Sequence, residues 1–468
     1  MFLVFFTKAQ PGNLETPISM EEKSETFTKY RIRSIHVFGN TRTKLELVKR
    51  ELEFSIEDSL NLQEWEQVKK RSEFNLINTS LFNSVEINCR ITDSISTFDV
   101  EITLKERWYF WPRPLFQIQD RNFNAWWENR DFYRANYGMY LNVNNIWGGS
   151  ESIRLVARKG YTELLGASLF LPYLNKSQTL GLSAGFKYQT NREIAFSTNQ
   201  NKLLFYRNYA EQVRKEWSAF LGLSFRTKKY SRQFLDLSWN KNQISDSVAG
   251  LNPEYFLKSR NSLEYFGLKY TYRYDVRDSK VFPRTGSFVE FTLEKSGLNF
   301  LVQENIDEMG LSLHAKKYIS LANRFFLSTA VKLRHRFNPQ PNYFLNRALG
   351  FQDYIKGYEY YVIDGQSFVF SKFNIAYPLV KPSLYKIKTS RFKKFSEIPY
   401  SLYLSAHTDI GMVKENYFYS ENPLSNTWLW GSGLSLTFIS YYDYVFRLDF
   451  SVNKFNEKGI FLHFNSPI

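Results

Sequence analysis

The chain has 468 residues, enough for two domains or for a small domain joined to one large architecture. Aromatic residues make up 18% of it, yet its mean hydropathy is −0.41, and no apolar run approaches the roughly 18–20 residues that a membrane helix requires. Aromatics dispersed in this way favour a β-barrel that faces lipid outside and water inside. A soluble β-sandwich or propeller is the alternative.

The formal net charge is +15. The basic residues are scattered through alternating segments and do not gather on one helix or arm. This pattern argues against nucleic acid as a partner and favours a solvated lumen and anionic lipid headgroups. Cys89 is the single cysteine, so one chain can form neither a disulfide nor a thiolate metal site, and we expect a small buried hydrophobic residue there.

The first residues, MFLVFFTKAQPG, have the pattern of the end of a secretory signal, with an apolar stretch before Lys8-Ala9-Gln10. No basic region precedes the stretch, and it is shorter than usual. Residues 1–29 are therefore assigned to a truncated signal-like segment and linker. The alternative is that the segment is not a signal.

Residues 30–106 mix strand and helix patterns. YRIRSIHVFGN alternates as a strand with Ile32, Ile35 and Val37 as its apolar members. Thr43 can cap a helix over TKLELVKRELEF, and NLQEWEQVKKRSEFNLINTS has a second helical pattern. The strand candidates SVEINCRI and FDVEITLKE follow. The order strand, helix, helix, strand, strand predicts a small α+β domain.

Residues 107–468 predict strands and no convincing helix. Residues 266–275 alternate aromatic or apolar with polar residues, and 446–453 repeat this, with Phe446, Leu448, Phe450 and Val452 between Arg447, Asp449, Ser451 and Asn453. Soluble sheets also alternate, but here the pattern persists with no second apolar layer to cover it. At about 10 residues a strand, the length predicts a transmembrane antiparallel β-barrel of about 16 strands.

Together these parts resemble a known superfamily. IHVFGNTRTKLELVKREL, LFNSVEI and VEITLKER resemble a polypeptide-transport-associated (POTRA) domain of βααββ order. The rest resembles the outer-membrane assembly and translocation β-barrel superfamily (BamA/TamA-like, bacterial surface antigen family). Four barrel stretches carry this resemblance, in the family's order: NNIWGGSE at 144–151, YDVRDSKVFPRTG at 274–286, YIKGYE at 354–359 and HTDIG at 407–411.

The resemblance implies a function for the loop around Lys356. In the superfamily this loop folds back into the barrel, and its arginine meets the aspartate of the later strand motif. The implied loop-anchor residues are Ile355, Lys356, Gly357, Tyr358, Asp409 and Gly411. Lys356 would pair with Asp409, Gly357 would allow a tight turn, and Tyr358 would pack on the wall. Because this chain has lysine where the family has arginine, a bidentate pair is impossible, and Arg347 is an alternative partner for Asp409.

Two further sets of residues are implied by the resemblance. The barrel motif comprises Asp275, Arg277, Asp278, Pro283 and Gly286. The C-terminal strand signal comprises Gly459, Phe461 and Phe464, although the family usually ends on an aromatic residue and this chain ends on Ile468.

Enzyme motifs are weak in this sequence. GLSAG at 181–185 matches a nucleophile elbow around Ser183, but it lies in an alternating strand pattern without a following helix. The five histidines are dispersed and form no metal-binding pair. We therefore expect no catalytic residues, no metal and no cofactor.

The function implied by the resemblance is an assembly factor that inserts or translocates polypeptides at the bacterial outer membrane, with its POTRA domain in the periplasm. The implied partners are unfolded outer-membrane or secreted polypeptides, membrane lipid, and periplasmic or lipoprotein accessory factors. The seam between the first strand (near 113–121) and the last (near 459–465) would be the weak point for lateral opening. The alternatives are a translocator of one dedicated partner, as in two-partner secretion, and a passive pore.

Overall fold

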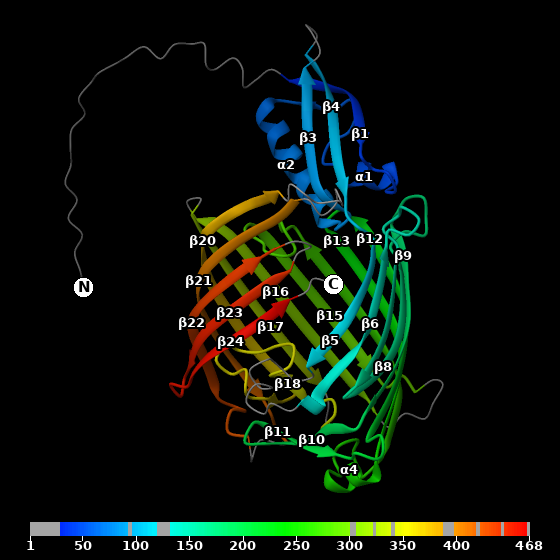
Figure 1. Ribbon diagram of the computed structural model, residues 1–468, viewed down its shortest axis with the longest axis vertical. Coiled ribbons are helices and arrows are strands. Elements are labelled where there is room, and N and C mark those ends of the chain that lie inside the picture. The colour runs from blue at the N-terminus through cyan, green and yellow to red at the C-terminus, as the bar shows by residue number, and fades with distance from the viewer. Residues whose placement is uncertain are drawn as a thin grey trace, which may run out of the picture.

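The computed structural model describes residues 29–91, 96–118, 132–299, 306–321, 324–337, 342–386, 397–417, 422–440 and 444–465. A small N-terminal domain (residues 30–106) stands on one end of a barrel formed by strands that lie between Phe110 and Asn465 (Figure 1). The barrel end beside this domain is called the near end, and the opposite end is called the far end. The signal-like segment expected at residues 1–29 lies, apart from Lys29, outside the described residues.

The N-terminal domain packs two helices against one face of a small sheet. Its elements are β1 (Tyr30–Phe38), α1 (Leu45–Glu51), β2 (Ser59–Leu60), α2 (Leu62–Asn78), β3 (Phe82–Ile91) and β4 (Thr97–Glu106). The sheet order is β2-β1-β4-β3, with β1 parallel to β4 and β3 at one edge. The predicted order of strands and helices is present, and the short β2 is added to it. Trp65 packs between Phe54 and Phe98 at the centre of the core.

The two helices begin in different ways. Asn61 caps α2 through a capping box, because its side chain accepts from the Glu64 N–H while the Glu64 side chain accepts from the Asn61 N–H. The cap predicted for the first helix is wrong: Lys44 is the N-cap of α1 and makes no side-chain cap bond. Thr43 instead donates its N–H and hydroxyl to the buried carboxylate of Glu106, each over 2.7 Å.

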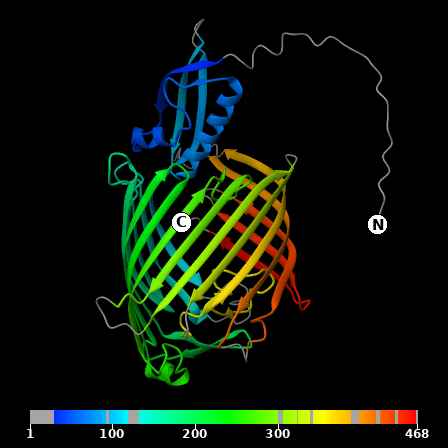
Figure 2. The ribbon, with the colours of Figure 1, turned by 180° about the vertical axis from the view of Figure 1, so that it is seen from behind.

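The barrel wall is a single antiparallel sheet of 16 strands, as predicted. In chain order the strands are β5 (Phe110–Ile118), β6 (Ala135–Asn144), β7 (Ser152–Gly160), β8 (Thr162–Leu171), β9 (Leu180–Asn191), β12 (Arg214–Lys228), β13 (Ser231–Ile244), β14 (Ser262–Asp275), β15 (Gly286–Ser296), β16 (Glu308–Leu321), β17 (Phe325–Phe337), β20 (Ser367–Lys386), β21 (Glu397–Lys414), β22 (Trp428–Ile439), β23 (Val445–Asn453) and β24 (Lys458–Asn465). Each pairs with the next, so β5 and β24 stand at the two ends of the sheet order. Seen from behind, the strands tilt steeply across the wall (Figure 2).

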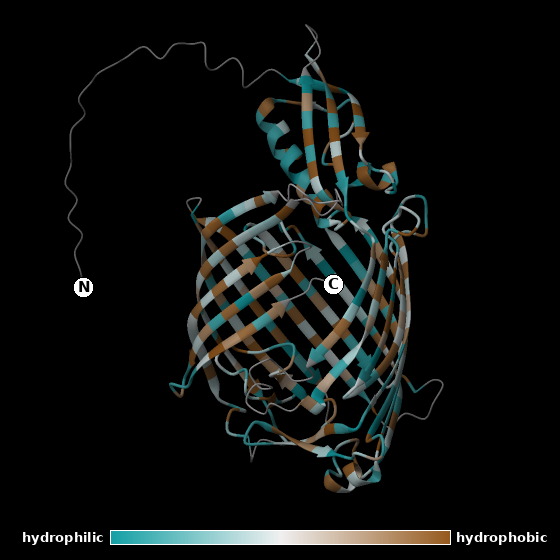
Figure 3. Ribbon diagram, in the orientation of Figure 1, coloured by the Kyte–Doolittle hydropathy of each residue, from teal (hydrophilic) through white to brown (hydrophobic). Residues whose placement is uncertain are grey.

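Burial in the wall is the reverse of that in a soluble sheet. On β23 the aromatic Phe446 and Phe450 are 39% and 44% exposed, whereas Asp449 is 0% exposed. Brown and teal segments alternate along the strands for the same reason (Figure 3). Exposure of so many aromatic side chains is unfavourable in water but favourable in the hydrocarbon of a bilayer. The outward face is therefore the lipid face, and the polar face lines the lumen.

Several short elements lie at the far end of the barrel. They are η1 (Phe132–Arg134), the hairpin β10 (Glu193–Asn199) and β11 (Lys202–Arg207), α4 (Asp246–Leu251), and the pair β18 (Arg347–Leu349) and β19 (Ile363–Asp364). The prediction of no helix after residue 107 is therefore wrong for two single turns. Both lie in connections between strands, where a short local pattern gives no periodic signal.

Two smaller points complete the fold. No helix in the described part of the chain is long and apolar enough to cross a bilayer. Cys89 is exposed on the edge strand β3, and the expectation of a buried residue is wrong. Ile87, two positions before Cys89 and on the same face of the strand, is buried, so Cys89 lies on the core face of the sheet but is exposed near the end of β3.

Candidate functional site

The connection from β17 to β20 folds from the far end into the lumen. Ile355 and Tyr358 are 1% and 2% exposed, and they pack in one cluster with Phe368 and Phe370 of β20 and Leu429 of β22. Gly357 has a φ of +87°, which glycine adopts without strain. The loop therefore reaches the wall at Ile355, Gly357 and Tyr358, the positions that the resemblance implied.

The Lys356 ammonium does not contact Asp409, the partner implied by the resemblance. Its Nζ lies 3.5 Å from Asp449 Oδ2 on β23 and 3.1 Å from Ser435 Oγ on β22. Asp409 Oδ2 instead accepts the backbone N–H of Lys356 over 3.1 Å. The Lys356 backbone stays beside β21, and its long side chain extends along the wall. The ammonium therefore lies beyond Asp409.

Asp409 and Asp449 each have a cation of their own from the wall. Lys372 is the register partner of Asp409 on the neighbouring strand β20, and its Nζ lies 3.1 Å from Asp409 Oδ2. Arg447 lies two residues before Asp449 on the same face of β23, with its Nε 3.0 Å from Asp449 Oδ2. Arg347, the proposed substitute, lies in β18 with its guanidinium over the Phe351 ring.

The loop backbone is held as tightly as its side chains. A Cβ at Gly431 would lie 1.8 Å from the Lys356 carbonyl oxygen, and one at Gly411 would lie 2.9 Å from Ile355 Cδ1. Lys372 Nζ also donates to the Tyr354 carbonyl over 2.6 Å, and Arg447 donates to the Tyr354 hydroxyl over 2.7 Å. Glycines in β21 and β22 thus leave room for the loop, Gly431 for the Lys356 main chain and Gly411 for the Ile355 side chain. We call the contacts of residues 354–359 with β20–β24 the loop anchor.

Sequence reasoning found part of this anchor and missed the rest. The alternation in 446–453 predicts only that Arg447 and Asp449 are polar members of a strand and assigns them no partner. Lys372 and Gly431 were not singled out. The signal that could have found the charged residues is a full charge at an inward position of a strand. A buried charge of this kind needs a counter-charge nearby.

The anchor also touches the last strand. His463 of β24 stacks on Tyr354 with ring centroids 5.4 Å apart, and Phe461 packs near Tyr360. Of the residues implied as the C-terminal signal, Phe461 is 2% exposed and points inward, Phe464 is outward, and a Cβ at Gly459 would strike the Phe461 ring. The last strand is therefore in contact with the loop.

Glu359, Asp449 and His463 bring three potential metal ligands within 4.8 Å of one another. The His463 Nε2 lies 3.4 Å from Asp449 and 3.9 Å from Glu359. Lys356 and Arg447 both contact Asp449, so a dication would add further positive charge in a buried place that already holds two cations. These groups fit an ion-pair network better than a metal centre.

The barrel motif forms a folded turn at the near end. Asp275 and Arg277 make a bidentate pair of 2.8 and 2.7 Å, and Asp278 Oδ1 accepts the backbone N–H groups of Ser279, Arg284 and Thr285. Gly286, with a φ of +110°, begins β15 where a Cβ would lie 2.3 Å from the Val276 carbonyl oxygen. Pro283 lies between them in the same turn.

This turn also contacts the N-terminal domain. Asn78, at the end of α2, donates to the Arg277 carbonyl over 3.1 Å and accepts from the Lys280 N–H over 3.1 Å. A second near-end turn, in the 144–151 motif, meets the segment before α1. There the Lys44 N–H donates to the Gly148 carbonyl over 2.9 Å, and the Asn145 amide donates to Thr43 Oγ1 over 2.9 Å.

A buried ion pair closes the contact between the domain and the barrel. The Glu51 carboxylate of α1 accepts two bonds from Arg226 of β12, over 2.7 and 2.9 Å, and two from Arg50, over 3.1 and 2.6 Å. Burial by itself would raise the pKa of Glu51, but the hydrogen bonds and charge of Arg226, with the charge of Arg50, outweigh it and hold the pKa at about 2. We call the contacts of Thr43, Lys44, Glu51 and Asn78 with the near-end turns and β12 the rim contact.

The enzyme-like motif has a structural place. Ser183 lies in the middle of β9, paired with Phe170 of β8 and Gly222 of β12, and the strand continues on both sides. No strand-to-helix turn is present around it in the described residues, so the geometry of a nucleophile elbow is not formed.

Comparison with known proteins agrees with this architecture. Residues 145–465 match the Omp85 superfamily domain, and residues 30–107 match the POTRA family described as a surface antigen variable number repeat. No curated protein matches the sequence.

Two solved structures share the fold at low sequence identity. BamA from Haemophilus ducreyi lacking POTRA domains 1–3 is 15% identical with a TM-score of 0.51, over 92% of this chain and 83% of that one. CdiB from Escherichia coli is 12% identical with a TM-score of 0.52, over 96% of this chain and 91% of that one. The domain, the barrel and the matched residues together show that this chain belongs to the Omp85 superfamily.

Proposed function

We propose that this protein inserts or translocates polypeptides at the bacterial outer membrane, with the N-terminal domain in the periplasm. The observation that carries the proposal is the attachment of a POTRA domain to the near-end rim while an anchored loop occupies the lumen. A polypeptide held on the domain would thus already lie at the mouth of the barrel. Membership of the Omp85 superfamily supports this proposal.

Strand β3 is the element that we propose receives the client. It lies at the edge of the sheet order and pairs with β4 on one side. An extended polypeptide can add to such an edge through main-chain hydrogen bonds, which tolerate many client sequences. The clients would be unfolded outer-membrane or secreted polypeptides, with lipid and periplasmic or lipoprotein factors as further partners.

The first and last strands are the proposed place of lateral opening. β5 and β24 are the ends of the sheet order, and the loop anchor reaches β24 at Phe461 and His463. A loop fixed to the last strand would hold the register of that strand while its neighbour moves. We also propose that the chain divides functionally at residue 107, between the domain and the barrel.

Depletion of the protein in its own host tests the proposal. A broad loss of outer-membrane proteins, measured by quantitative proteomics of the isolated membrane, is the expected result. Loss of one secreted protein alone would instead identify a dedicated translocator. A change in solute uptake with an unchanged proteome would identify a passive pore and contradict the proposal.

Cross-linking tests the client edge. A photoreactive residue in place of the exposed Cys89 on β3 should capture nascent polypeptides, whereas one in place of the exposed Gln63 on α2 should not. Equal capture at both positions would contradict recognition by the sheet edge.

A further inference from the structure

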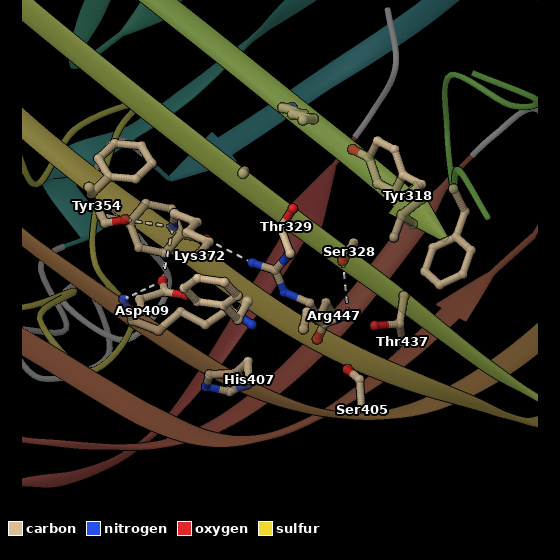
Figure 4. A pocket seen from close by; sticks show the side chains of 18 of the residues that line it. Tyr318, Ser328, Thr329, Tyr354, Lys372, Ser405, His407, Asp409, Thr437 and Arg447 are labelled. Carbon is tan, nitrogen blue, oxygen red and sulfur yellow. Dashed lines mark hydrogen bonds and ion pairs between the residues drawn. The ribbon is translucent and has the colours of Figure 1, made fainter. Parts of the chain in front are cut away.

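A cavity of about 600 Å³ lies inside the barrel, between the loop anchor and the near-end turn. The loop contributes Tyr354 and Lys356, the turn contributes Lys280 and Phe282, and the wall contributes β16, β17 and β20–β23. Figure 4 shows Lys372, Asp409 and Tyr354 together on one side of this space, with Arg447 extending toward them and Tyr318 and Thr437 on the other side. The volume is typical of a binding site for a small molecule.

The lining is rich in positive charge. Its cationic side chains are Lys280, Lys316, Lys356, Lys372 and Arg447, and its carboxylates are Asp353 and Asp409. Both of these carboxylates already have a lysine partner: Lys332 binds Asp353 over 2.7 Å, and Lys372 lies 3.1 Å from Asp409. Neither is therefore available to neutralise the remaining cations.

Lys280 and Lys316 are the cations without a carboxylate within 4.0 Å among the residues that the structure describes. Lys280 Nζ donates to the Asn78 backbone carbonyl over 2.7 Å, a neutral partner. The Lys316 Nζ lies 5.6 Å from the centre of the Phe288 ring, which leaves its hydrogen-bonding capacity to water or a ligand. An ammonium has three donors, so Lys316 can direct all of them into the cavity.

Lys356 and Arg447 share a single counter-charge. Lys356 and Arg447 both contact Asp449, which lies behind the lining, so one carboxylate serves two cations. The chamber thus has an excess of fixed positive charge inside a wall that borders lipid. Fixed charges attract a counter-ion more strongly in such a low-dielectric enclosure than on an open surface.

We propose that this cavity binds a soluble oligoanion of the phosphate class. Phosphate oxygens accept several bonds from lysine and arginine at once, and hydroxyl and amide groups of Ser328, Thr437 and Asn374 line the same space. A bound anion would connect the near-end turn, through Lys280, with the wall beside the loop anchor. The barrel wall separates the chamber from the bilayer, which favours a soluble anion over a lipid headgroup.

Pyrophosphate binding by the purified full-length protein tests this proposal. The midpoint of thermal unfolding is measured in nanodiscs of phosphatidylcholine as pyrophosphate is added, with potassium chloride used to hold the ionic strength constant. A saturable rise that chloride does not reproduce is expected. Lys316→Gln should weaken the apparent Kd at least tenfold, and Lys316→Arg should restore most of the affinity.

The neighbouring Lys317→Gln is the matched control. Lys317 is exposed on the opposite face of β16 and donates to Ser287, so the change removes the same charge outside the cavity. Its affinity for pyrophosphate should stay within about twofold of the unchanged protein, because distant surface charges are screened by salt.

Three results would overturn the proposal. The first is a pyrophosphate effect no larger than that of chloride at equal ionic strength. The second is an equal loss of affinity in Lys316→Gln and Lys317→Gln, which would indicate non-specific charge attraction. The third is competition by phosphatidylglycerol when it replaces part of the phosphatidylcholine, which would identify a lipid headgroup as the occupant.

Discussion

The loop anchor and the rim contact both attach a segment to the barrel through buried ion pairs, but they differ in depth and in composition. In the loop anchor, Asp449 is 0% exposed and binds two cations, and Gly431 leaves room for the loop backbone. In the rim contact, Glu51 binds Arg226 at the border between two separately packed bodies, with further bonds from Thr43, Lys44 and Asn78.

This difference indicates different tasks. A carboxylate enclosed by the wall has no water to replace a lost cation, so the loop anchor resists rearrangement. The rim contact joins polar groups that can each be solvated when the domain moves away. We therefore expect the loop to be a fixed part of the barrel and the domain to be able to detach and return.

The largest expected effect is that of Asp449→Asn. The change leaves the Lys356 and Arg447 cations buried without their shared counter-charge, and we expect a loss of about 3–5 kcal/mol of barrel stability. Heat-modifiable mobility on gels and thermal unfolding measure this loss of stability. Trypsin should also cleave the variant at Lys356. Asp307→Asn, at an exposed far-end pair with Lys295, is the control and should change little. Equal losses of stability in Asp449→Asn and Asp307→Asn would contradict a stabilising role of the loop anchor.

The rim contact should depend on acidity. Because the pKa of Glu51 is lowered from 4.5 to about 2, its contribution is complete above pH 4.5 and is lost as the pH falls toward 2. That contribution is about 3 kcal/mol at most. Glu51→Gln should remove this dependence and release the domain at neutral pH.

Distance measurements between two spin labels follow the release of the domain. One label is placed on Cys89 of β3 and the other on Lys176→Cys in the near-end turn after β8. Glu51→Gln should broaden the distance distribution. Glu57→Gln, at a pair with Arg31 that is 67% exposed on the glutamate side, should leave it unchanged. A narrow distribution in Glu51→Gln would mean that the neutral contacts suffice for docking.

Gly431→Ala tests whether the backbone groove holds the loop. The added Cβ would lie 1.8 Å from the Lys356 carbonyl oxygen, so the loop must move away from β22. We expect a loss of about 1–3 kcal/mol and faster trypsin cleavage within 350–366. Gly250→Ala has open space around its Cβ and is the control, with an effect near zero. An unchanged cleavage rate in Gly431→Ala would contradict the groove.

The smallest expected effect is a loss of stability that is confined to the N-terminal domain. Asn61→Ala removes the cap of α2 and should cost about 1 kcal/mol, seen as faster hydrogen exchange in α2 without a change in the barrel. Gln63→Ala, on the exposed side of the same first turn, should have almost no effect. A parallel loss of protection in β22 or β23 would show that the domain and the loop anchor are coupled.

The sequence by itself determined the architecture. Period-two alternation over residues 107–468 predicts a wall with one apolar face, because in a strand neighbouring side chains point to opposite faces. The order of strands and helices in 30–106, the 16 strands and the superfamily followed from such local patterns and from short motifs. The glycine and tyrosine beside Lys356 were also predicted to lie where the loop meets the wall, and they do.

Only the tertiary structure decided which charges meet. Lys356 reaches Asp449, 93 positions later on β23, while Asp409 takes Lys372 from the adjoining strand. Alternation shows that Arg447 and Asp449 share a face, but it cannot show which loop side chain arrives there. The same holds for Glu51 and Arg226, which are local surface residues of separate elements until the domain is placed on the barrel. Ion pairing in the lumen depends on strand stagger and loop path, which are properties of the closed barrel and not of any one segment.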